Sequence, residues 1–339
     1  MKRIFLVVIL AMFGMRVLAV DKGDNNPQAI IFETDMGNDI DDAMALDLLF
    51  KNMDKGNITL LGVSVHKNNP YAKEYIDVMR CWYGYKKMPI GVNSACVTDM
   101  DCVDYCTKTV QMKNEAGEPL FAGSKKPKYE EAVDMYRRLL SKADDSSVVI
   151  VTVGFSTTIA QLLDSQSDKY SKLSGRELVA KKVKYFSVMA GEFTIPDFAE
   201  YNVWNDLEAA RTLFETSPVP MVFTPWQLGE QVQYPGQSIE MDFAWGEPHP
   251  MVEAYKHYLT MPYNRPTWDV IAAYYACYPD AECFTISEAG NIKVVGKGVT
   301  QFLPAKDGKC RYLTATPDQR QQILDYFKTV LTTKPKNKK

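Results

Sequence analysis

Histidine is scarce in this 339-residue chain, which contains only three. This scarcity excludes a histidine-rich metal site and limits the acid–base chemistry that imidazole can supply. A basic excess is also missing, because 39 lysines and arginines stand against 42 aspartates and glutamates, so we expect no nucleic-acid partner. With 46% hydrophobic and 24% charged residues, the composition is typical of a folded globular protein.

Long hydrophobic runs are missing beyond the N-terminus. Residues 1–19 show a basic pair, an apolar stretch too short for a comfortable membrane span, and a small-residue cleavage pattern that ends at Ala19. This order predicts a signal peptide, with a buried N-terminal strand as the alternative. We therefore expect residues 20–339 to form a single domain that is secreted or periplasmic, with no membrane attachment.

None of the seven cysteines forms a Cys-x-x-Cys zinc pattern. Cys96, Cys102 and Cys106 cluster in one segment, where either a disulfide of an exported protein or unpaired buried thiols would fit. Because seven is an odd number, at least one cysteine is free or pairs with another chain.

Strand-like and helix-like segments alternate along the chain. Ala29–Thr34 and Ser147–Val153 are continuous apolar runs, as in strands that are buried on both faces. The other expected strands are 58–66, 88–92, 184–189 and 219–224, and the expected helices are 41–50, 71–83, 129–142, 156–163, 206–215 and 267–277. This alternation predicts an α/β fold with an open, mostly parallel Rossmann-like sheet and helices on both faces.

The C-terminal part departs from this alternation. Residues 292–295 and 300–303 predict a small hairpin, and 317–331 predicts a final amphipathic helix. Two long segments, 93–127 and 227–266, read as loops. Because structureless loops of that length are usually lids or binding loops, we expect both to border a site.

The strongest candidate site is an acidic loop between the first expected strand and helix. Asp35, Asp39, Asp41 and Asp42 place four carboxylates within eight residues. Ligands of open α/β sheets bind beyond the carboxyl ends of the strands, and like charges this close need a compensating cation. The ligand atoms are all oxygen, which favours calcium over zinc. The alternative interpretation is a capped helix preceded by an acidic, solvated loop.

Two other acidic motifs do not fit this loop. An EF-hand loop that starts at Asp35 requires glycine at its sixth position and glutamate at its twelfth, where the chain has Ile40 and Leu46. A phosphatase with an aspartyl nucleophile requires Asp-x-Asp at the strand end, and Gly37 occupies the place of the second aspartate.

Around the acidic loop the chain resembles the inosine–uridine preferring nucleoside hydrolases, whose signature is Asp-Thr-Asp-Pro-Gly-x-Asp-Asp-Ala. Here Glu33–Gly37 reads ETDMG, and after two extra residues Asp41–Ala45 reads DDAMA. The resemblance extends over roughly residues 29–305. It implies a calcium-dependent hydrolase that splits ribonucleosides into ribose and free base and that assembles as a homo-oligomer.

The resemblance also assigns roles to individual residues. Asp35 would bind calcium and deprotonate the attacking water, Asp42 would bind calcium, and Asp41 would contact ribose. Thr157, in a segment that resembles Gly-Pro-Leu-Thr-Asn, would bind calcium through its backbone carbonyl. Asp269, which begins a helix late in the chain, would be the last calcium ligand.

Further residues would surround the ribose and the base. Asn68, with Asn69 as the alternative, follows the second strand and would contact ribose. Glu200 and Asn202 lie in a segment similar to Glu-Phe-Asn and would hold ribose hydroxyls. Trp268 stands where the family has a histidine that protonates the departing base. Tryptophan cannot act as a general acid, but it can stack on a base or close the pocket. The alternative is a core tryptophan at the start of a helix.

This departure on the leaving-group side keeps two further functions open. One is a non-catalytic, calcium-dependent protein that binds ribosyl or other sugar groups, and the other is a hydrolase of a different ribosyl N-glycoside. His249, between two prolines in the second long segment, is either a lid residue that reaches the pocket or an exposed loop histidine. Tyr234 and Trp245 in the same segment are either lid residues or packing aromatics.

Overall fold

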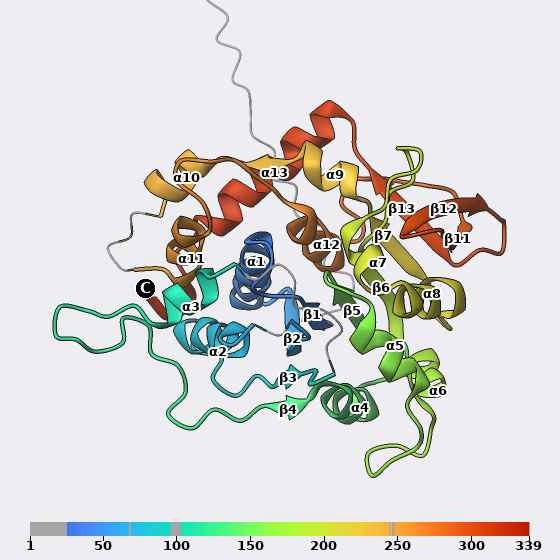
Figure 1. Ribbon diagram of the computed structural model, residues 1–339, viewed down its shortest axis with the longest axis horizontal. Helices are drawn as coiled ribbons and strands as arrows, with labels where there is room; N and C mark the ends of the chain where they lie inside the picture. Colours follow the sequence, from blue (N-terminus) through green and yellow to red (C-terminus); the bar gives the residue numbers. More distant parts are fainter. Residues whose placement is uncertain (1–25, 68, 96–102, 244, 246–247, 339) are drawn as a thin grey trace, which may run out of the picture.

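The computed structural model (Figure 1) describes residues 26–67, 69–95, 103–243, 245 and 248–338. The expected signal peptide, Asn68, Cys96 and Cys102 lie outside the described residues. Within the described ranges, no helix has the length and apolar character needed to cross a membrane.

A large sheet forms the centre of the molecule. Its parallel strands, in sheet order, are β4 (Glu130–Glu131), β3 (Ile90–Val92), β2 (Ile58–Val65), β1 (Gln28–Thr34), β5 (Val148–Thr152), β6 (Val183–Met189), β7 (Met221–Thr224) and β13 (Cys310–Thr314). Beside β13 the sheet continues with three antiparallel strands, β11 (Gly290–Val295), β12 (Val299–Pro304) and β10 (Thr285–Ile286). The predicted C-terminal hairpin is therefore β11–β12, and it extends the main sheet. A separate antiparallel pair is formed by β8 (Gln233–Tyr234) and β9 (Arg265–Pro266).

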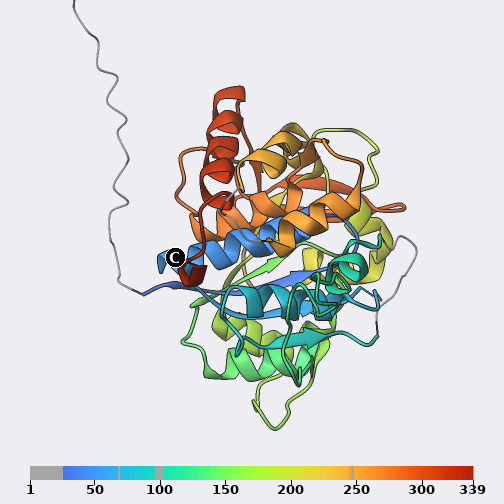
Figure 2. The ribbon, with the colours of Figure 1, turned by 90° about the vertical axis from the view of Figure 1, so that its left-hand side faces the viewer.

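Helices cover both faces of this sheet (Figures 1 and 2). The core on one face includes α1 (Asp41–Lys55), α2 (Ala72–Trp82), α11 (Pro250–Tyr258), α12 (Trp268–Cys277) and α13 (Pro317–Leu331). The core on the other face includes α4 (Ala132–Lys142), α5 (Thr157–Asp164), α6 (Gly175–Lys182) and α8 (Leu207–Thr216). The shorter helices are α3 (Tyr105–Val110), α7 (Tyr201–Asn205), α9 (Trp226–Gln231), α10 (Gly236–Met241) and the 3-10 turn Lys336–Lys338. The predicted α/β class with a mostly parallel sheet is confirmed.

The central strands are buried on both sides, as their apolar runs predict. Ile30 and Phe32 of β1 point into the core shared with α1, whereas Ile31 between them points into the core shared with α4. This alternation follows from the two-residue period of a strand. All three side chains are fully buried, which requires an apolar residue at every position.

The position of β1 in the sheet decides where a ligand can bind. β1 pairs with β2 on one side and with β5 on the other. The chain proceeds from β1 through β2 and β3 to β4, and then returns to the opposite side of β1 to form β5. Such a reversal of strand order opens a crevice at the carboxyl ends of the two strands beside it, here β1 and β5.

The two long segments are more ordered than the sequence predicts. The first contains α3, and the second contains α10, α11 and the β8–β9 pair and begins within α9. Pro225 and Pro235 are the N-caps of α9 and α10, and Pro250 is the first residue of α11. Pro250 fits the first turn of a helix, where the missing N–H of proline costs no hydrogen bond.

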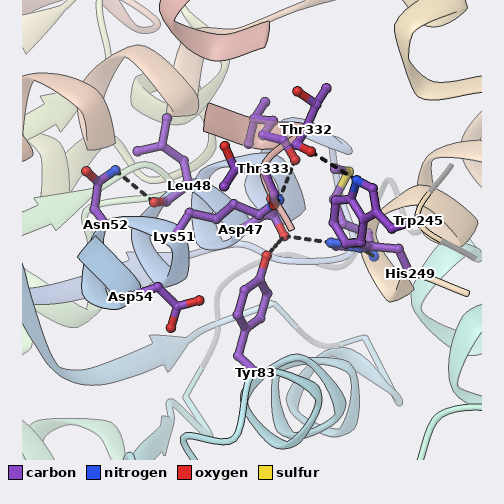
Figure 3. A network of polar contacts seen from close by, with 12 residues as sticks. Asp47, Leu48, Lys51, Asn52, Asp54, Tyr83, Trp245, His249, Thr332 and Thr333 are labelled. Atoms are coloured by element: carbon purple, nitrogen blue, oxygen red, sulfur yellow. Dashed lines mark hydrogen bonds and ion pairs between the residues drawn. The ribbon is translucent and has the colours of Figure 1, made fainter. Parts of the chain in front are cut away.

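His249 is neither a lid residue nor an exposed one, in contrast to both expectations. It caps α11 by accepting a hydrogen bond from the Met251 N–H at 3.1 Å, and it is almost fully buried. Its Nε2 lies 3.2 Å from Oδ1 of Asp47 (Figure 3). The two lid candidates Tyr234 and Trp245 are also packing residues, because neither lines the crevice and Tyr234 is fully buried.

Asp47 is the centre of a buried polar network between α1, α2 and α11 (Figure 3). It accepts a hydrogen bond from Tyr83, while Nε2 of His249 lies 3.2 Å and Nζ of Lys51 lies 3.6 Å from its carboxylate oxygens. Burial opposes ionisation of Asp47, yet Lys51 and His249 outweigh it and lower the pKa of this carboxyl. Lys51 Nζ also donates to the Thr333 carbonyl at 2.7 Å, which ties the end of α13 to α1.

We expect Asp47→Ala to reduce the free energy of unfolding by about 3–5 kcal/mol, because Lys51 would stay buried without its carboxylate. Urea unfolding measures this loss. Asp325→Ala on the exposed side of α13 is the matched control, with an expected change within about 0.5 kcal/mol. A loss below about 1 kcal/mol for Asp47→Ala would show that the network contributes little to stability.

Candidate active site

A pocket of about 370 Å³ lies at the crevice beyond β1 and β5. The predicted site residues that line it are Asp35, Asp41, Asp42, Glu200, Asn202, Trp268 and Asp269. Residues separated by more than 230 positions in sequence thus meet at one place. A larger hollow of about 810 Å³ beside Trp82 contains none of the predicted residues.

The acidic residues reach the pocket from three chain segments. Asp35 directly follows β1, Asp41 and Asp42 form the first turn of α1, and Asp269 lies in the first turn of α12. Helix N-termini carry a partial positive charge, which favours carboxylates at these positions. Between β1 and α1 the chain turns at Gly37, where φ is +101° and a Cβ atom would lie 2.6 Å from Nδ2 of Asn69. Glycine is therefore required at this turn.

Asp41 and Asp42, in the first turn of α1, each accept one hydrogen bond. Asp42 accepts a hydrogen bond from the hydroxyl of Thr34, and Asp41 Oδ2 accepts one from the Asp269 N–H at 3.0 Å. The second oxygens, Oδ1 of Asp41 and Oδ2 of Asp42, are buried without a hydrogen-bond partner, and so is Oδ2 of Asp35. Buried carboxylate oxygens without a partner are costly, so a positively charged ligand would satisfy these three oxygens.

The pKa values of the four carboxyls agree with this interpretation. Burial raises the pKa of Asp35 to about 6 and that of Asp41 to about 7. Burial and the neighbouring carboxylates raise the pKa values of Asp42 and Asp269 well above the usual range. Lys67 opposes the shift at Asp35; its ammonium group is buried without a hydrogen-bond partner. The sequence analysis did not predict Lys67 as a site residue.

The carboxyls of Asp35, Asp41, Asp42 and Asp269 have the donor atoms that a hard divalent cation prefers. All of their donor atoms are oxygen, as calcium prefers, and three of those oxygens have no other partner. Among the residues that the structure describes, no group of three or more histidine, cysteine, aspartate or glutamate side chains is arranged to hold a metal ion. The acids therefore line one pocket without converging on a single point.

Glu200 and Asn202 lie on the opposite wall and are held firmly by the backbone. Glu200 caps α7, and its carboxylate accepts hydrogen bonds from the N–H groups of Gly191, Asn202 and Val203 at 3.0, 3.0 and 3.2 Å. Asn202 donates from Nδ2 to the carbonyls of Val153 and Met189 at 2.8 and 3.1 Å. Because its amide hydrogens are engaged, Asn202 presents an acceptor, Oδ1, to a ligand hydroxyl.

Trp268 forms an aromatic wall and cannot donate a hydrogen bond to a ligand. Its indole N–H donates to the Trp226 carbonyl at 2.8 Å, and the two rings stack with centroids 6.4 Å apart. Gly229 makes this packing possible, because a Cβ atom there would lie 2.0 Å from the indole ring. Both interpretations of Trp268, stacking on a base and closing the pocket, are compatible with this position.

Thr157 lies in the first turn of α5 but does not line the pocket. Its hydroxyl donates to Asp206 at 2.6 Å, whereas Val153 at the end of β5 does line the pocket. Asn68 lies outside the described residues, and the alternative Asn69 is buried against Gly37.

A cluster at the edge of the pocket joins the predicted loop residue Asp39 to Tyr258 and Arg265, which were not predicted. Tyr258 of α11 donates its hydroxyl hydrogen to Oδ1 of Asp39 at 2.6 Å, and Arg265 forms an ion pair with the same carboxylate. The Arg265 guanidinium lies 5.0 Å from the ring centroids of both Tyr258 and Trp268. The sequence signal for this cluster was the acidic loop itself, which includes Asp39 and is two residues longer than the family signature.

The parallel sheet reverses its strand order beside an acidic pocket with aromatic walls. This arrangement is that of an α/β enzyme that binds a small molecule at the carboxyl ends of its strands. The family model described as inosine-uridine preferring nucleoside hydrolase matches residues 30–324. The chain therefore belongs to this family and is a hydrolase of the N-glycosidic bond of ribonucleosides, which confirms the resemblance inferred from the sequence.

Solved structures share the fold. A plant nucleoside hydrolase, PpNRh1, matches with a TM-score of 0.69 and 18% identity over 91% of this chain and 100% of its own. A purine-preferring ribonucleoside hydrolase from Gardnerella vaginalis matches with a TM-score of 0.69 and 16% identity over 90% and 98%. The type III effector protein XopQ, solved with adenosine diphosphate ribose, matches with a TM-score of 0.63 and 14% identity over 91% and 94%. No curated protein matches the sequence.

Proposed function

We propose that this protein hydrolyses ribonucleosides to ribose and free base in a calcium-dependent reaction, with Asp35 as the general base. The observation that carries the proposal is the set of three buried carboxylate oxygens without partners, on Asp35, Asp41 and Asp42, in a pocket at the strand ends. A divalent cation is the ligand that would satisfy them, because its charge also offsets the burial that raises the pKa values of these carboxyls.

Calcium would be held by Asp35, Asp42, Asp269 and a backbone carbonyl. Thr157 was the predicted source of that carbonyl, but Val153 is the better candidate because it lines the pocket. When bound, calcium supplies an electrophile that lowers the pKa of a coordinated water.

The side chains then have separate tasks. The Asp35 carboxylate accepts the proton of the attacking water; ionisation near neutral pH suits a general base. Asp41, Glu200 and Asn202 accept hydrogen bonds from ribose hydroxyls and favour the positive charge that develops on the sugar ring. Their attachment to backbone groups keeps them in place before substrate arrives.

A panel of ribosides tests this proposal. Purified protein should release reducing sugar and free base from at least one common ribonucleoside, and EGTA should abolish the release until excess calcium is restored. Asp269→Ala should weaken calcium binding, as measured by isothermal titration calorimetry. Intact calcium binding without turnover of any riboside would contradict the enzymatic proposal.

That last outcome would favour the second candidate, a calcium-dependent ribosyl-binding protein. The observation behind it is the absence of imidazole from the pocket lining. The structurally similar effector XopQ was solved with adenosine diphosphate ribose, which contains a ribosyl group. Binding of ribose or adenosine diphosphate ribose without cleavage would distinguish this function from hydrolysis.

We further propose that the protein is exported and salvages nucleosides outside the cytoplasm as a homo-oligomer. The support is the charged, apolar and small-residue order of residues 1–19 and the family resemblance. N-terminal sequencing of the mature protein should begin at residue 20, and light scattering should give a mass above that of one chain.

A further inference from the structure

None of the three histidines of this hydrolase is among the residues that line the pocket. His66 pairs through Nδ1 with Glu33, and its Nε2 accepts the Phe155 N–H at 3.1 Å, so both ring nitrogens are engaged. His249 is buried against Asp47, as described above. His257 lies on α11 and does not line the pocket. The sequence contains no other histidine, so imidazole cannot protonate a departing base here.

Burial raises the pKa values of the lining carboxyls Asp41 and Glu200, but a cation bound beside them favours their ionised forms, which accept protons and do not donate them. The other proton donors of the pocket are poor acids. The Trp268 N–H donates to a backbone carbonyl, and the Tyr258 hydroxyl donates to Asp39. Burial, together with Asp39, raises the pKa of Tyr258 further above that of a free phenol. The other donor groups among the described lining residues are the side-chain amide of Asn38 and the phenol of Tyr201, residue types that are weak acids.

The charge and shape of the pocket favour a flat cation instead. Among the described residues, six carboxyl groups and no lysine or arginine line it. Arg265, outside the lining, pairs with one of these carboxyls, Asp39, and the remaining five carry more negative charge than one divalent cation balances. Trp226, Trp268 and Tyr258 supply aromatic faces that attract cations through their ring quadrupoles. Arg265 illustrates this, because its planar guanidinium already stacks over Trp268 and Tyr258.

We propose, building on the hydrolase activity above, that the substrates of this site are ribosides whose leaving group is a positively charged aromatic ring, such as N-ribosylpyridinium compounds. The oxygen of water bonds to C1′, and the C1′–N bond breaks with its electron pair moving to the ring nitrogen. That pair cancels the positive charge, so the ring departs neutral and needs no proton. The proton released from water passes to Asp35 and then to solvent.

Binding of two leaving-group analogues tests the charge preference without any chemistry. Nicotinamide and 1-methylnicotinamide differ by one methyl group and one positive charge. Titration calorimetry of the calcium-loaded protein should show 1-methylnicotinamide binding at least tenfold more tightly. Equal or tighter binding of neutral nicotinamide, or no binding of the cation, would overturn the inference.

Turnover of matched ribosides tests the reaction itself. The values of kcat/KM for 7-methylguanosine and nicotinamide riboside should exceed those for guanosine and uridine by about 10²-fold or more, the contribution that a general acid ordinarily makes. This ratio should shrink at lower pH, where the medium protonates neutral bases. Comparable values for charged and neutral substrates would overturn the inference and leave the proposed function intact, whereas no turnover of any riboside would refute the proposed function itself.

Discussion

Asp35→Asn should lower kcat on the best riboside by about 10²–10⁴-fold, the usual contribution of a general base. The amide retains an oxygen that can face a cation, but it cannot accept a proton from water. Because burial disfavours the charge of Asp35, the variant without calcium should be at least as stable as the wild type at pH 8. Activity is measured by release of free base, and stability by thermal unfolding.

The control for this variant is Asp104→Asn, the same chemical change at an exposed residue just before α3. It should leave kcat and KM unchanged. Turnover by Asp35→Asn within about threefold of the wild type would show that another group accepts the proton. A large loss of stability would instead indicate that Asp35 has a mainly structural role.

Without calcium, the protein should become less stable as the pH rises from about 4 to about 8. The pKa values of Asp35 and Asp41 in the folded protein are about 6 and about 7, above their ordinary value of 3.8. Between these values the folded state binds more protons than the unfolded state, so its stability falls with rising pH. The raised pKa of Asp35 alone corresponds to a loss on the order of 3 kcal/mol, which lowers the melting temperature by several degrees.

Calcium should reverse this loss at pH 8 and have little effect at pH 5, because protonated carboxyls bind cations weakly. Thermal unfolding in EGTA and in millimolar calcium, at both pH values, measures the difference. Asp41→Asn should flatten the pH dependence of the calcium-free protein, since it removes the carboxyl with the pKa near 7. A calcium-free protein that is more stable at pH 8 than at pH 5 would contradict the proposed cation site.

Local patterns in the sequence predicted the parts of the fold that local interactions control. The apolar run of Ala29–Thr34 predicted β1, which begins one residue earlier. The prediction of a final helix over 317–331 matches α13 at both ends, because Thr316 caps the helix and Pro317 begins it. The acidic loop was recognisable because four carboxylates within eight residues need a compensating positive charge in any fold.

Contacts between distant segments decided what sequence patterns could not. The Tyr258–Asp39–Arg265 cluster joins residues more than 200 positions apart, and its members are ordinary surface residue types in the sequence. His249 resembled a loop histidine until the structure placed it beside Asp47. In both cases the partner lies on another element, so periodicity and spacing contain no information about it.

By itself, the sequence determined the α/β class, the place of the acidic loop after the first strand, and the scarcity of histidine. These follow from hydrophobic period, residue type and residue count, which are properties of the chain. Only the tertiary structure decided that Asp269 joins Asp35 in one pocket and that Val153 rather than Thr157 lines it. It also decided that the Trp268 N–H is already engaged, because burial and the direction of a hydrogen bond exist only once the elements are packed together.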